Sequence, residues 1–292
     1  MDYRSQFLIT NSAEKLNMSS IATQIDLEMG EEQIEKRIKK NRKKLAELQE
    51  KLYAEDRRSV LVVFQAMDAA GKDSTIREVF TGLNPQGTGF YSFKSPSKEE
   101  LAHDFLWRCN KKLPPKGHIN VFNRSHYEET LVVRVHPGYL MGQRLPEIKS
   151  PADADQAFWN ARFEMINEWE ERIQKNGTTI IKFFLNVGLD EQKSRFLRRL
   201  NLPHKNWKFN SGDLKERALW DNYMAAYADM MPKTSQSHAP WYCIPADDKP
   251  TMRLIVSEIV KDILKGMKPT YPEVTEEFLA EKKEALKMLG EE

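Results

Sequence analysis

The sequence has little cysteine, no long apolar segment and almost no net charge. Its 292 residues include two cysteines, Cys109 and Cys243, with no Cys-x-x-Cys pair. This excludes a disulfide scaffold and a cysteine-rich zinc site. The longest apolar runs, near residues 60–67 and 180–189, are too short to span a bilayer. The N-terminus shows no apolar signal region, so we expect a cytoplasmic protein without a membrane association.

Charge balance also limits the partners. The chain carries 45 Lys and Arg against 43 Asp and Glu, a formal net charge of +2. Such a balance gives no overall attraction to nucleic acid, so any anionic partner must be held by a local basic cluster. No Gly-x-Ser-x-Gly or His-Glu-x-x-His motif occurs, so neither a serine hydrolase nor a paired-histidine zinc site is indicated.

Apolar runs and helical patterns alternate along most of the chain. Continuous apolar or β-rich runs predict strands at 59–64, 91–93, 119–122, 179–185 and 241–244. Helical patterns occupy 72–82, 97–112, 156–176, 190–200, 213–231 and 250–266 between and after them. This alternation predicts an α/β fold, in which a five-stranded parallel sheet carries helices on both faces. In such sheets ligands bind beyond the carboxyl ends of the strands.

An amphipathic helix is predicted upstream of the sheet, over residues 31–53. Ile34, Ile38, Leu45, Leu48 and Leu52 share one face, and the other faces are rich in Lys and Arg. We interpret the basic side as a solvated helix face in preference to an anion-binding arm.

The junction after the first strand resembles a phosphate-binding loop. The pattern G-x-x-x-x-G-K-[ST] cradles phosphate oxygens with backbone N–H groups and reaches the transferred phosphate with its lysine. Gly71 and Lys72 match this pattern directly after a strand, whereas Ala66 replaces the first glycine and Asp73 the magnesium-binding hydroxyl. A carboxylate beside phosphates requires a cation between them, and Mg²⁺ prefers such oxygen ligands. With Asp68, this loop suits a Mg²⁺-bridged polyanion.

The third strand ends in Asn-Arg-Ser-His-Tyr-Glu, residues 123–128. Nucleotide kinases with a phosphate-binding loop often place an acid and an arginine here, and the arginine clamps phosphate. In this chain Arg124 is kept, but Asn123 replaces the acid and cannot act as a base. Glu128 is the nearest carboxylate that could replace it.

A basic segment with Pro203 and Gly212 lies between two helices, over residues 191–217. We interpret it as a hinged lid that closes over phosphates, in preference to a solvated helical hairpin. Asp213, with Glu216 three residues on, is expected near the N-cap of the second helix.

Several blocks together resemble the polyphosphate kinase 2 family. They include FQAMDAAGKDST, SFKSPSKEELAHDFLWR, VFNRSHYEETLVVRVHP and KNWKFNSGDLKERALWDNYMAAYADM, and they extend in order from about residue 50 to 265. The resemblance implies a three-layer, thymidylate-kinase-like fold with a phosphate-binding loop and a helical lid. The expected parts are an N-terminal extension and helix (1–55), a kinase domain (56–268) with the lid at about 190–231, and a helical tail (269–292).

The implied activity is reversible transfer of the terminal phosphate of inorganic polyphosphate to a nucleotide, with Mg²⁺ or alternatively Mn²⁺. The sequence Asn123 to Glu128 resembles class III members, which accept both AMP and ADP; guanine nucleotides are further candidate acceptors. A homodimer or homotetramer is implied only by the resemblance. The rival hypotheses are an ATP-dependent nucleoside or nucleoside monophosphate kinase and a non-catalytic polyphosphate- or nucleic-acid-binding protein.

The expected site residues follow from the motifs and the resemblance. Catalytic roles are expected for Asp68, Lys72, Asp73, Arg124 and Glu128, of which Asp68, Asp73 and Glu128 would bind the metal. Phosphate or nucleotide binding is expected for Ala69, Ala70, Gly71, Ser74, Thr75, Asn123, Arg134, Arg198, Arg199, Lys205, Lys208 and Arg217.

Overall fold

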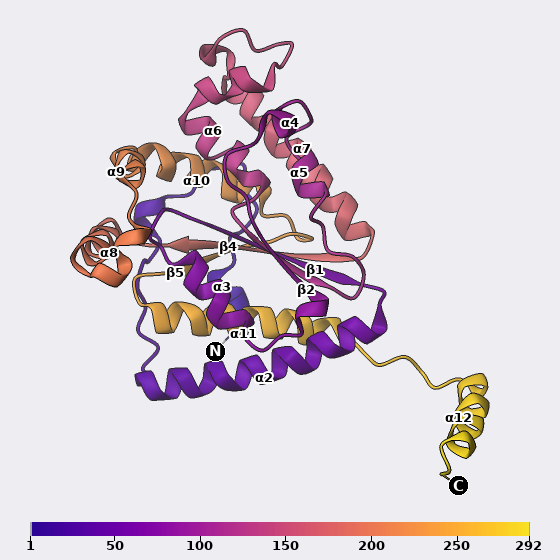
Figure 1. The fold of residues 1–292 in the computed structure, drawn as a ribbon. Coiled ribbons are helices and arrows are strands. Elements are labelled where there is room, and N and C mark those ends of the chain that lie inside the picture. Colours follow the sequence, from indigo (N-terminus) through magenta and orange to yellow (C-terminus); the bar gives the residue numbers. More distant parts are fainter. Residues whose placement is uncertain (1, 292) are drawn as a thin grey trace.

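A computed structural model describes residues 2–291, with a parallel β-sheet at the centre (Figure 1). Its strands are β1 (Ser59–Ala66), β2 (Thr88–Ser92), β3 (Ile119–Asn123), β4 (Thr178–Asn186) and β5 (Trp241–Pro245). They follow the order β2-β3-β1-β4-β5, and every neighbouring pair is parallel. The predicted five-stranded parallel sheet is therefore confirmed.

Helices cover both faces of this sheet. The helices α2 (Glu31–Glu55), α3 (Lys72–Phe80) and α11 (Lys249–Met267) lie on one side, and α7 (Gln156–Lys175) and α10 (Trp220–Thr234) lie on the other (Figure 1). All eight residues of β1 are buried, as its uninterrupted apolar pattern requires for a strand covered on both faces. The layered α/β architecture expected from the sequence is confirmed.

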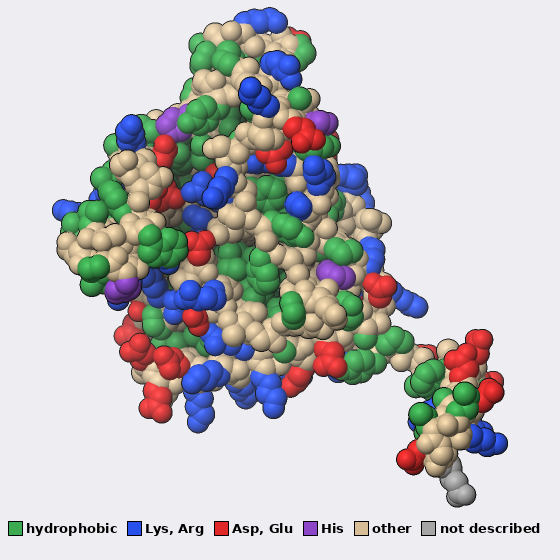
Figure 2. Space-filling model, in the orientation of Figure 1, with side chains coloured by type: hydrophobic (Ala, Val, Ile, Leu, Met, Phe, Trp, Pro, Cys, Tyr) green, Lys and Arg blue, Asp and Glu red, His purple; other side chains and the backbone are tan. Residues whose placement is uncertain are grey.

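The amphipathic helix is present as α2, with its apolar face against α11. Ile34, Ile38, Leu45, Leu48 and Leu52 are buried. Arg37 pairs with Glu258 of α11 and Arg42 with Glu78 of α3, so two of its cations bind the body of the protein. The lysines at 36, 39, 40, 43 and 44 are exposed along the lower edge of the molecule (Figure 2).

Two predicted helices are interrupted. The segment 97–112 forms α4 (Lys98–Leu101) and α5 (Trp107–Asn110), because the Asp104 carboxylate accepts from the backbone N–H of Leu106 and starts a new turn. The segment 213–231 belongs to α9 (Ser211–Ala218) and α10. The Asn210 side chain accepts from the N–H of Gly212 as the N-cap of α9, and Asp213 lies in the first turn of that helix, in the N-cap region as expected.

The N-terminal residues pack on the sheet and its helices. The short helix α1 (Tyr3–Phe7) buries Tyr3 and Phe7, and Leu8 forms an antiparallel bridge with Tyr242 of β5. The Asn186 side chain donates to the carbonyls of Ile21 and Ala22. This segment therefore pairs with the first half of β5 and reaches the carboxyl end of β4.

Shorter elements complete the chain. They are η1 (Met18–Ser20), η2 (Pro85–Gly87), η3 (His126–Glu129), α6 (Val132–Val135), η4 (Pro137–Gln143), η5 (Pro151–Asp153), α8 (Leu189–Asn201), η6 (Pro203–Lys208) and α12 (Glu276–Met288). Helix α12 extends away from the body (Figure 1). Within residues 2–291, none of the helices is both apolar enough and long enough to span a membrane.

Candidate active site

A tight loop joins β1 to α3 and carries the phosphate-binding pattern. Ala69 and Gly71 both have positive φ angles, 61° and 110°. These conformations curl the backbone so that successive N–H groups can face one side, as a phosphate nest requires. A Cβ at Gly71 would lie 3.3 Å from Cε of Met252, so the position favours glycine for both its conformation and its surroundings.

Lys72 folds back across this loop. Its Nζ donates to the carbonyl oxygen of Ala66 at 2.7 Å, six residues upstream. Burial, together with the nearby Arg124 guanidinium, lowers the pKa of Lys72. A desolvated ammonium held only by backbone carbonyls is suited to exchange that contact for an anionic phosphate oxygen.

The ends of β1 and β3 bring the two predicted motifs together. Phe64 and Asn123 are register partners, so Arg124 emerges beside the phosphate loop. Arg124 Nη2 lies 2.9 Å from Asp68 Oδ1, and the Asn123 amide donates to the Asp73 carboxylate. The fold thus assembles the expected acids and cations at one edge of the sheet.

Arg124 also faces Glu128. The distance from Arg124 Nη1 to Glu128 Oε2 is 3.7 Å, and Arg124 itself has a positive φ of 62°. Burial raises the pKa of Glu128, although Arg124 and Lys72 oppose that shift. Arg124 therefore bridges one carboxylate on the phosphate loop and a second, more enclosed carboxylate after β3.

The residues expected to bind metal fit a cation held jointly with phosphates. Among residues 2–291 there is no cluster of three or more Asp, Glu, His or Cys side chains that could cage an ion. Mg²⁺ is usually held by one or two carboxylates and completes its shell with substrate phosphates and water. Asp68 and Asp73, on the phosphate loop itself, match that donor set. Glu128 matches it less well, because its carboxylate faces Arg124 and its burial raises its pKa.

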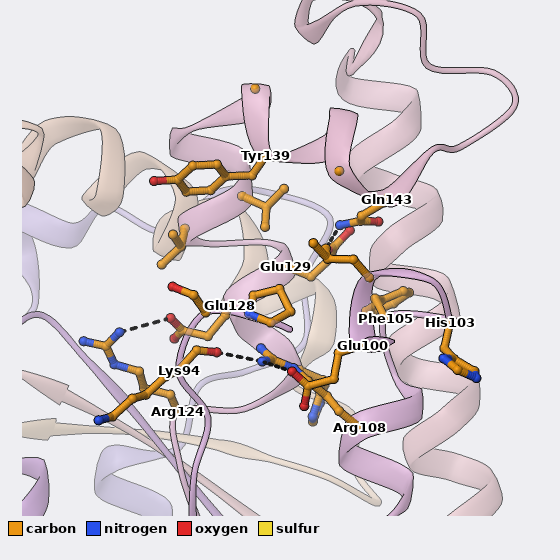
Figure 3. Close-up of a pocket in the computed structure, with 18 residues that line it drawn as sticks. Lys94, Glu100, His103, Phe105, Arg108, Arg124, Glu128, Glu129, Tyr139 and Gln143 are labelled. Atoms are coloured by element: carbon orange, nitrogen blue, oxygen red, sulfur yellow. Dashed lines mark hydrogen bonds and ion pairs between the residues drawn. The ribbon is translucent and has the colours of Figure 1, made fainter. Parts of the chain in front are cut away.

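A cavity of about 460 Å³ opens beside Arg124 and Glu128 (Figure 3). Phe105, Val132, Val133 and Tyr139 give it apolar walls. Polar groups converge on it: Arg108 donates to the carbonyl of Lys94, and Gln143 donates to Glu129. A cavity of this size that combines apolar walls with convergent polar and charged side chains is suited to a small molecule that has both an apolar part and a charged part.

Comparison with known proteins agrees with this architecture. Residues 28–272 match the family model described as polyphosphate kinase 2 (PPK2). The chain belongs to the polyphosphate kinase 2 family. It is 44% identical over 289 residues to the ADP-polyphosphate phosphotransferase of Rhodopseudomonas palustris, covering 99% of this chain and 98% of that protein. It is 46% identical to the AMP/ADP-polyphosphate phosphotransferase of Meiothermus ruber, over 79% of this chain and 81% of the relative.

A solved structure of a family member has the same fold. The polyphosphate kinase 2 from Arthrobacter aurescens superposes with a TM-score of 0.85 at 35% identity, covering 97% of each chain. The three-layer kinase fold expected from the sequence is thereby confirmed for this family member.

Several of the expected phosphate-binding side chains of this kinase are engaged elsewhere. Arg134 pairs with Asp229 at 2.7 Å, Arg199 pairs with Asp213 at 3.1 Å, and Arg217 donates to Gln192 and to the carbonyl of Leu189. Thr75 is buried, with its hydroxyl directed to the Met252 sulfur. These four side chains are held by other protein groups in this conformation.

Other expected residues keep accessible side chains or contribute backbone. Arg198 and Lys208 are exposed and Lys205 is half-buried, all within the basic segment 191–217. The Ser74 hydroxyl donates to the carbonyl of Gly71. Lys and Arg side chains, with acidic ones beside them, lie along the boundary between α8–α9 and the centre of the molecule (Figure 2).

The basic segment 191–217 also contains an acid that the sequence pattern placed in a helix N-cap region. Burial and the neighbouring Asp68 carboxylate raise the pKa of Asp213, in spite of its partner Arg199. Asp213 therefore lies within electrostatic reach of the phosphate loop. Its spacing from Glu216 gave no sign of this, because the helix begins two residues earlier than expected.

The sequence reasoning also missed the role of Arg195. Its guanidinium is buried, and it donates to the carbonyls of Ala69 and Ala70 in the phosphate loop. It also donates to the carbonyls of Ala246 and Asp247, which follow β5. Arg195 therefore connects α8, the phosphate loop and β5. In the sequence, the only indication that Arg195 is functional was its position in the basic segment.

Two further cations stand at the start of α11. Burial, with the charges of Arg195, Arg198 and Arg253, lowers the pKa of Lys249 to about 8. Burial likewise lowers the pKa of Arg253, and its Nε is buried without a partner in the described structure. Cations crowded in this way favour an anion. In the sequence, the indication of these cations was the Asp-Asp-Lys run that follows the fifth strand.

Replacing Gly71 with alanine is expected to destabilise this kinase, because a left-handed conformation costs an alanine about 1–2 kcal/mol. The melting temperature should fall by roughly 2–8 °C, and the transfer rate should fall with the distorted loop. Gly266→Ala is the matched control, since Gly266 lies in α11 with nothing within 4 Å of an added Cβ. Thermal melts compare the two, and equal melting temperatures would contradict the strained-loop interpretation.

Proposed function

We propose that this family member transfers the terminal phosphate of inorganic polyphosphate to AMP and ADP, with Mg²⁺ as the divalent cation. The observation that carries the proposal is the position of Arg124, which contacts Asp68 of the phosphate loop and borders the cavity beside Glu128. A donor phosphate in the loop and an acceptor phosphate from the cavity would meet at this guanidinium. The names of both relatives support polyphosphate and ADP, and the name of the Meiothermus relative also supports AMP.

The cations on the lid side suit a polyphosphate donor. Arg198 is exposed on α8, and the charges of Arg198 and Arg253 help to lower the pKa of Lys249. Polyphosphate is a flexible polyanion, so cations spread along a surface hold it better than one rigid nest would. These three residues, with Lys205 and Lys208 of the lid, form the proposed donor path leading to the phosphate loop.

The cavity suits a nucleotide acceptor. Its aromatic and aliphatic walls can cover a base and ribose, while Arg124 at its inner end can pair with the acceptor phosphate. In the proposed arrangement, donor and acceptor would lie on opposite sides of Arg124. It fits an in-line transfer between two phosphate groups.

The proposed mechanism depends on positioning and charge neutralisation. Lys72 exchanges its contact with the Ala66 carbonyl for the transferred phosphoryl group, and Arg124 pairs with the same group. Asp68 and Asp73 would hold the divalent cation, which when bound neutralises charge on the phosphate oxygens. The acceptor oxygen is already anionic, so no general base is required. Asn123 can therefore occupy the position of the usual acid and hold Asp73 by a hydrogen bond.

The test uses purified protein, Mg²⁺, long-chain polyphosphate and either AMP or ADP, without added ATP. Ion-exchange chromatography should show ATP formed from ADP, and ADP followed by ATP formed from AMP. Product from a single acceptor would contradict dual acceptance and leave the polyphosphate donor intact. Transfer from ATP to a nucleoside, with none from polyphosphate, would overturn the donor assignment.

A further inference from the structure

A group of charged and polar side chains is buried beneath the turn that carries Arg124 and Glu128. Lys182 lies in the middle of β4, between Val63 of β1 and Trp241 of β5 in register. Both Lys182 and its partner Glu170 of α7 are fully buried, with 0% of each side chain exposed. Because burying an ion pair usually stabilises a fold no more than apolar side chains of similar volume, stability alone does not account for this pair.

Every donor of Lys182 is used. Its Nζ donates to Glu170 Oε2 at 2.5 Å, to the Tyr127 hydroxyl at 2.7 Å and to the carbonyl of Thr234 at 2.7 Å. Burial lowers the pKa of Lys182 to about 8, and Glu170 opposes that shift. The lysine thus joins the central sheet, α7 and the end of α10 at a single atom.

The other carboxylate oxygen of Glu170 holds η3. The Tyr127 hydroxyl donates to Glu170 Oε1 at 2.9 Å, and His126 Nε2 lies 3.4 Å from the same oxygen. Burial lowers the pKa of His126, which favours the neutral ring. A neutral ring that donates from Nε2 has its lone pair on Nδ1, and Nδ1 is buried without a partner in the described structure.

His126 and Tyr127 lie between Arg124 and Glu128 in the chain. Arg124 has a left-handed backbone that a residue with a Cβ adopts only when its surroundings enforce it. Its own N–H donates to the carbonyl of Phe64, and Ser125 Oγ accepts from the N–H of Tyr127. The contacts with Glu170 hold the side chains of His126 and Tyr127 in place. His126 also lines the cavity.

We propose that Lys182, Glu170, Tyr127 and His126 form a positioning group that holds the 124–128 turn, and thereby sets Arg124 and Glu128 against the phosphate loop and the cavity. The proposal rests on the proposed function, because it assigns a task to residues outside the reacting centre. None of the four is a catalytic residue. They act through Arg124 and Glu128.

Tyr127→Phe is the most conservative test, since it removes one oxygen and leaves the ring in place. The expected result is a fall in kcat of about ten- to a hundredfold, because a small displacement of a positioned group is costly. The KM values for polyphosphate and nucleotide should change by less than about threefold. Tyr242→Phe is the matched control, since Tyr242 is a buried tyrosine of β5 whose hydroxyl makes no hydrogen bond in the described structure. Equal kcat in the two variants would overturn the proposal.

The double variant Lys182→Met with Glu170→Met separates positioning from stability. It removes both charges and keeps the volume, so its melting temperature should stay near that of the unaltered protein. If the group positions the turn, this folded variant still loses most of its transfer rate. A variant that melts normally and transfers phosphate at the original rate would overturn the proposal.

A spectroscopic readout is independent of activity. In ¹⁵N-histidine spectra of the unaltered protein, His126 should be neutral with its proton on Nε2, and Glu170→Gln should remove that preference. Unchanged His126 signals in Glu170→Gln would overturn the positioning geometry. If the unaltered protein transfers no phosphate from polyphosphate, the proposed function fails instead, and these spectra alone decide the positioning geometry.

Discussion

Replacing Lys72 with methionine is expected to reduce phosphate transfer from polyphosphate by about a thousandfold, the scale seen when a charge-stabilising group is removed from a transition state. The physical reason is the desolvated ammonium of Lys72, which donates to the carbonyl of Ala66 and has no carboxylate of residues 2–291 within salt-bridge distance. Its charge is therefore available to the transferred phosphoryl group. Methionine keeps the length of the side chain and removes the charge. Initial rates with polyphosphate and ADP measure the effect.

Lys39→Met is the matched control, because Lys39 is exposed on α2 and belongs neither to the phosphate loop nor to the lining of the cavity. It should transfer phosphate at the original rate. The Lys72 variant should still bind nucleotide, since the cavity does not include Lys72 among its lining residues. A binding protein without catalysis would show no difference between the two variants. That outcome would contradict the kinase assignment of the phosphate loop.

Replacing Arg195 with alanine is expected to lower the stability of the protein by about 3 kcal/mol or more, because backbone acceptors would lose a buried charged donor. The guanidinium donates to the carbonyls of Ala69, Ala70, Ala246 and Asp247. The melting temperature should fall by roughly 6–12 °C. Transfer should fall as well, even at temperatures where the variant is folded, because two of these carbonyls belong to the phosphate loop.

Arg198→Ala gives the contrast on the same helix. Arg198 is exposed three residues further along α8, so its loss should leave the melting temperature unchanged. It should instead raise the KM for polyphosphate and weaken the dependence of that KM on salt. Calorimetry and kinetics at two ionic strengths distinguish the two arginines. If Arg195→Ala melts like Arg198→Ala, the connecting role of Arg195 is wrong.

Much of the fold was readable from residue patterns. The apolar run at 59–64 is buried on both faces as β1, and Ile34 to Leu52 form the buried face of α2. Gly71 and Lys72 follow β1 directly, as the phosphate-binding pattern predicts. These features depend on local spacing, because burial on both faces and helical periodicity leave a direct trace in the order of apolar residues.

The proximity of the motif residues could also be predicted from the sequence, because the carboxyl ends of parallel strands lie at one edge of the sheet. The sequence by itself placed Asp68, Lys72 and Arg124 at such ends, and the observed strand order brings β3 beside β1. The pairing of Arg124 with Asp68 follows from that order. The resemblance of the sequence blocks to the polyphosphate kinase 2 family indicates the substrate class without any use of the tertiary structure.

The direction of each long side chain was decided only by the tertiary structure. Arg195 and Arg198 stand in one basic run, yet Arg195 is buried against four carbonyls while Arg198 is exposed. Sequence reports charge and spacing, whereas the partner of a flexible guanidinium depends on which acceptors the fold brings within its reach. The same holds for Lys182 and Glu170, which read as ordinary residues of a strand and a helix. Only the packing of α7 on β4 turns them into the buried support of the Arg124 turn.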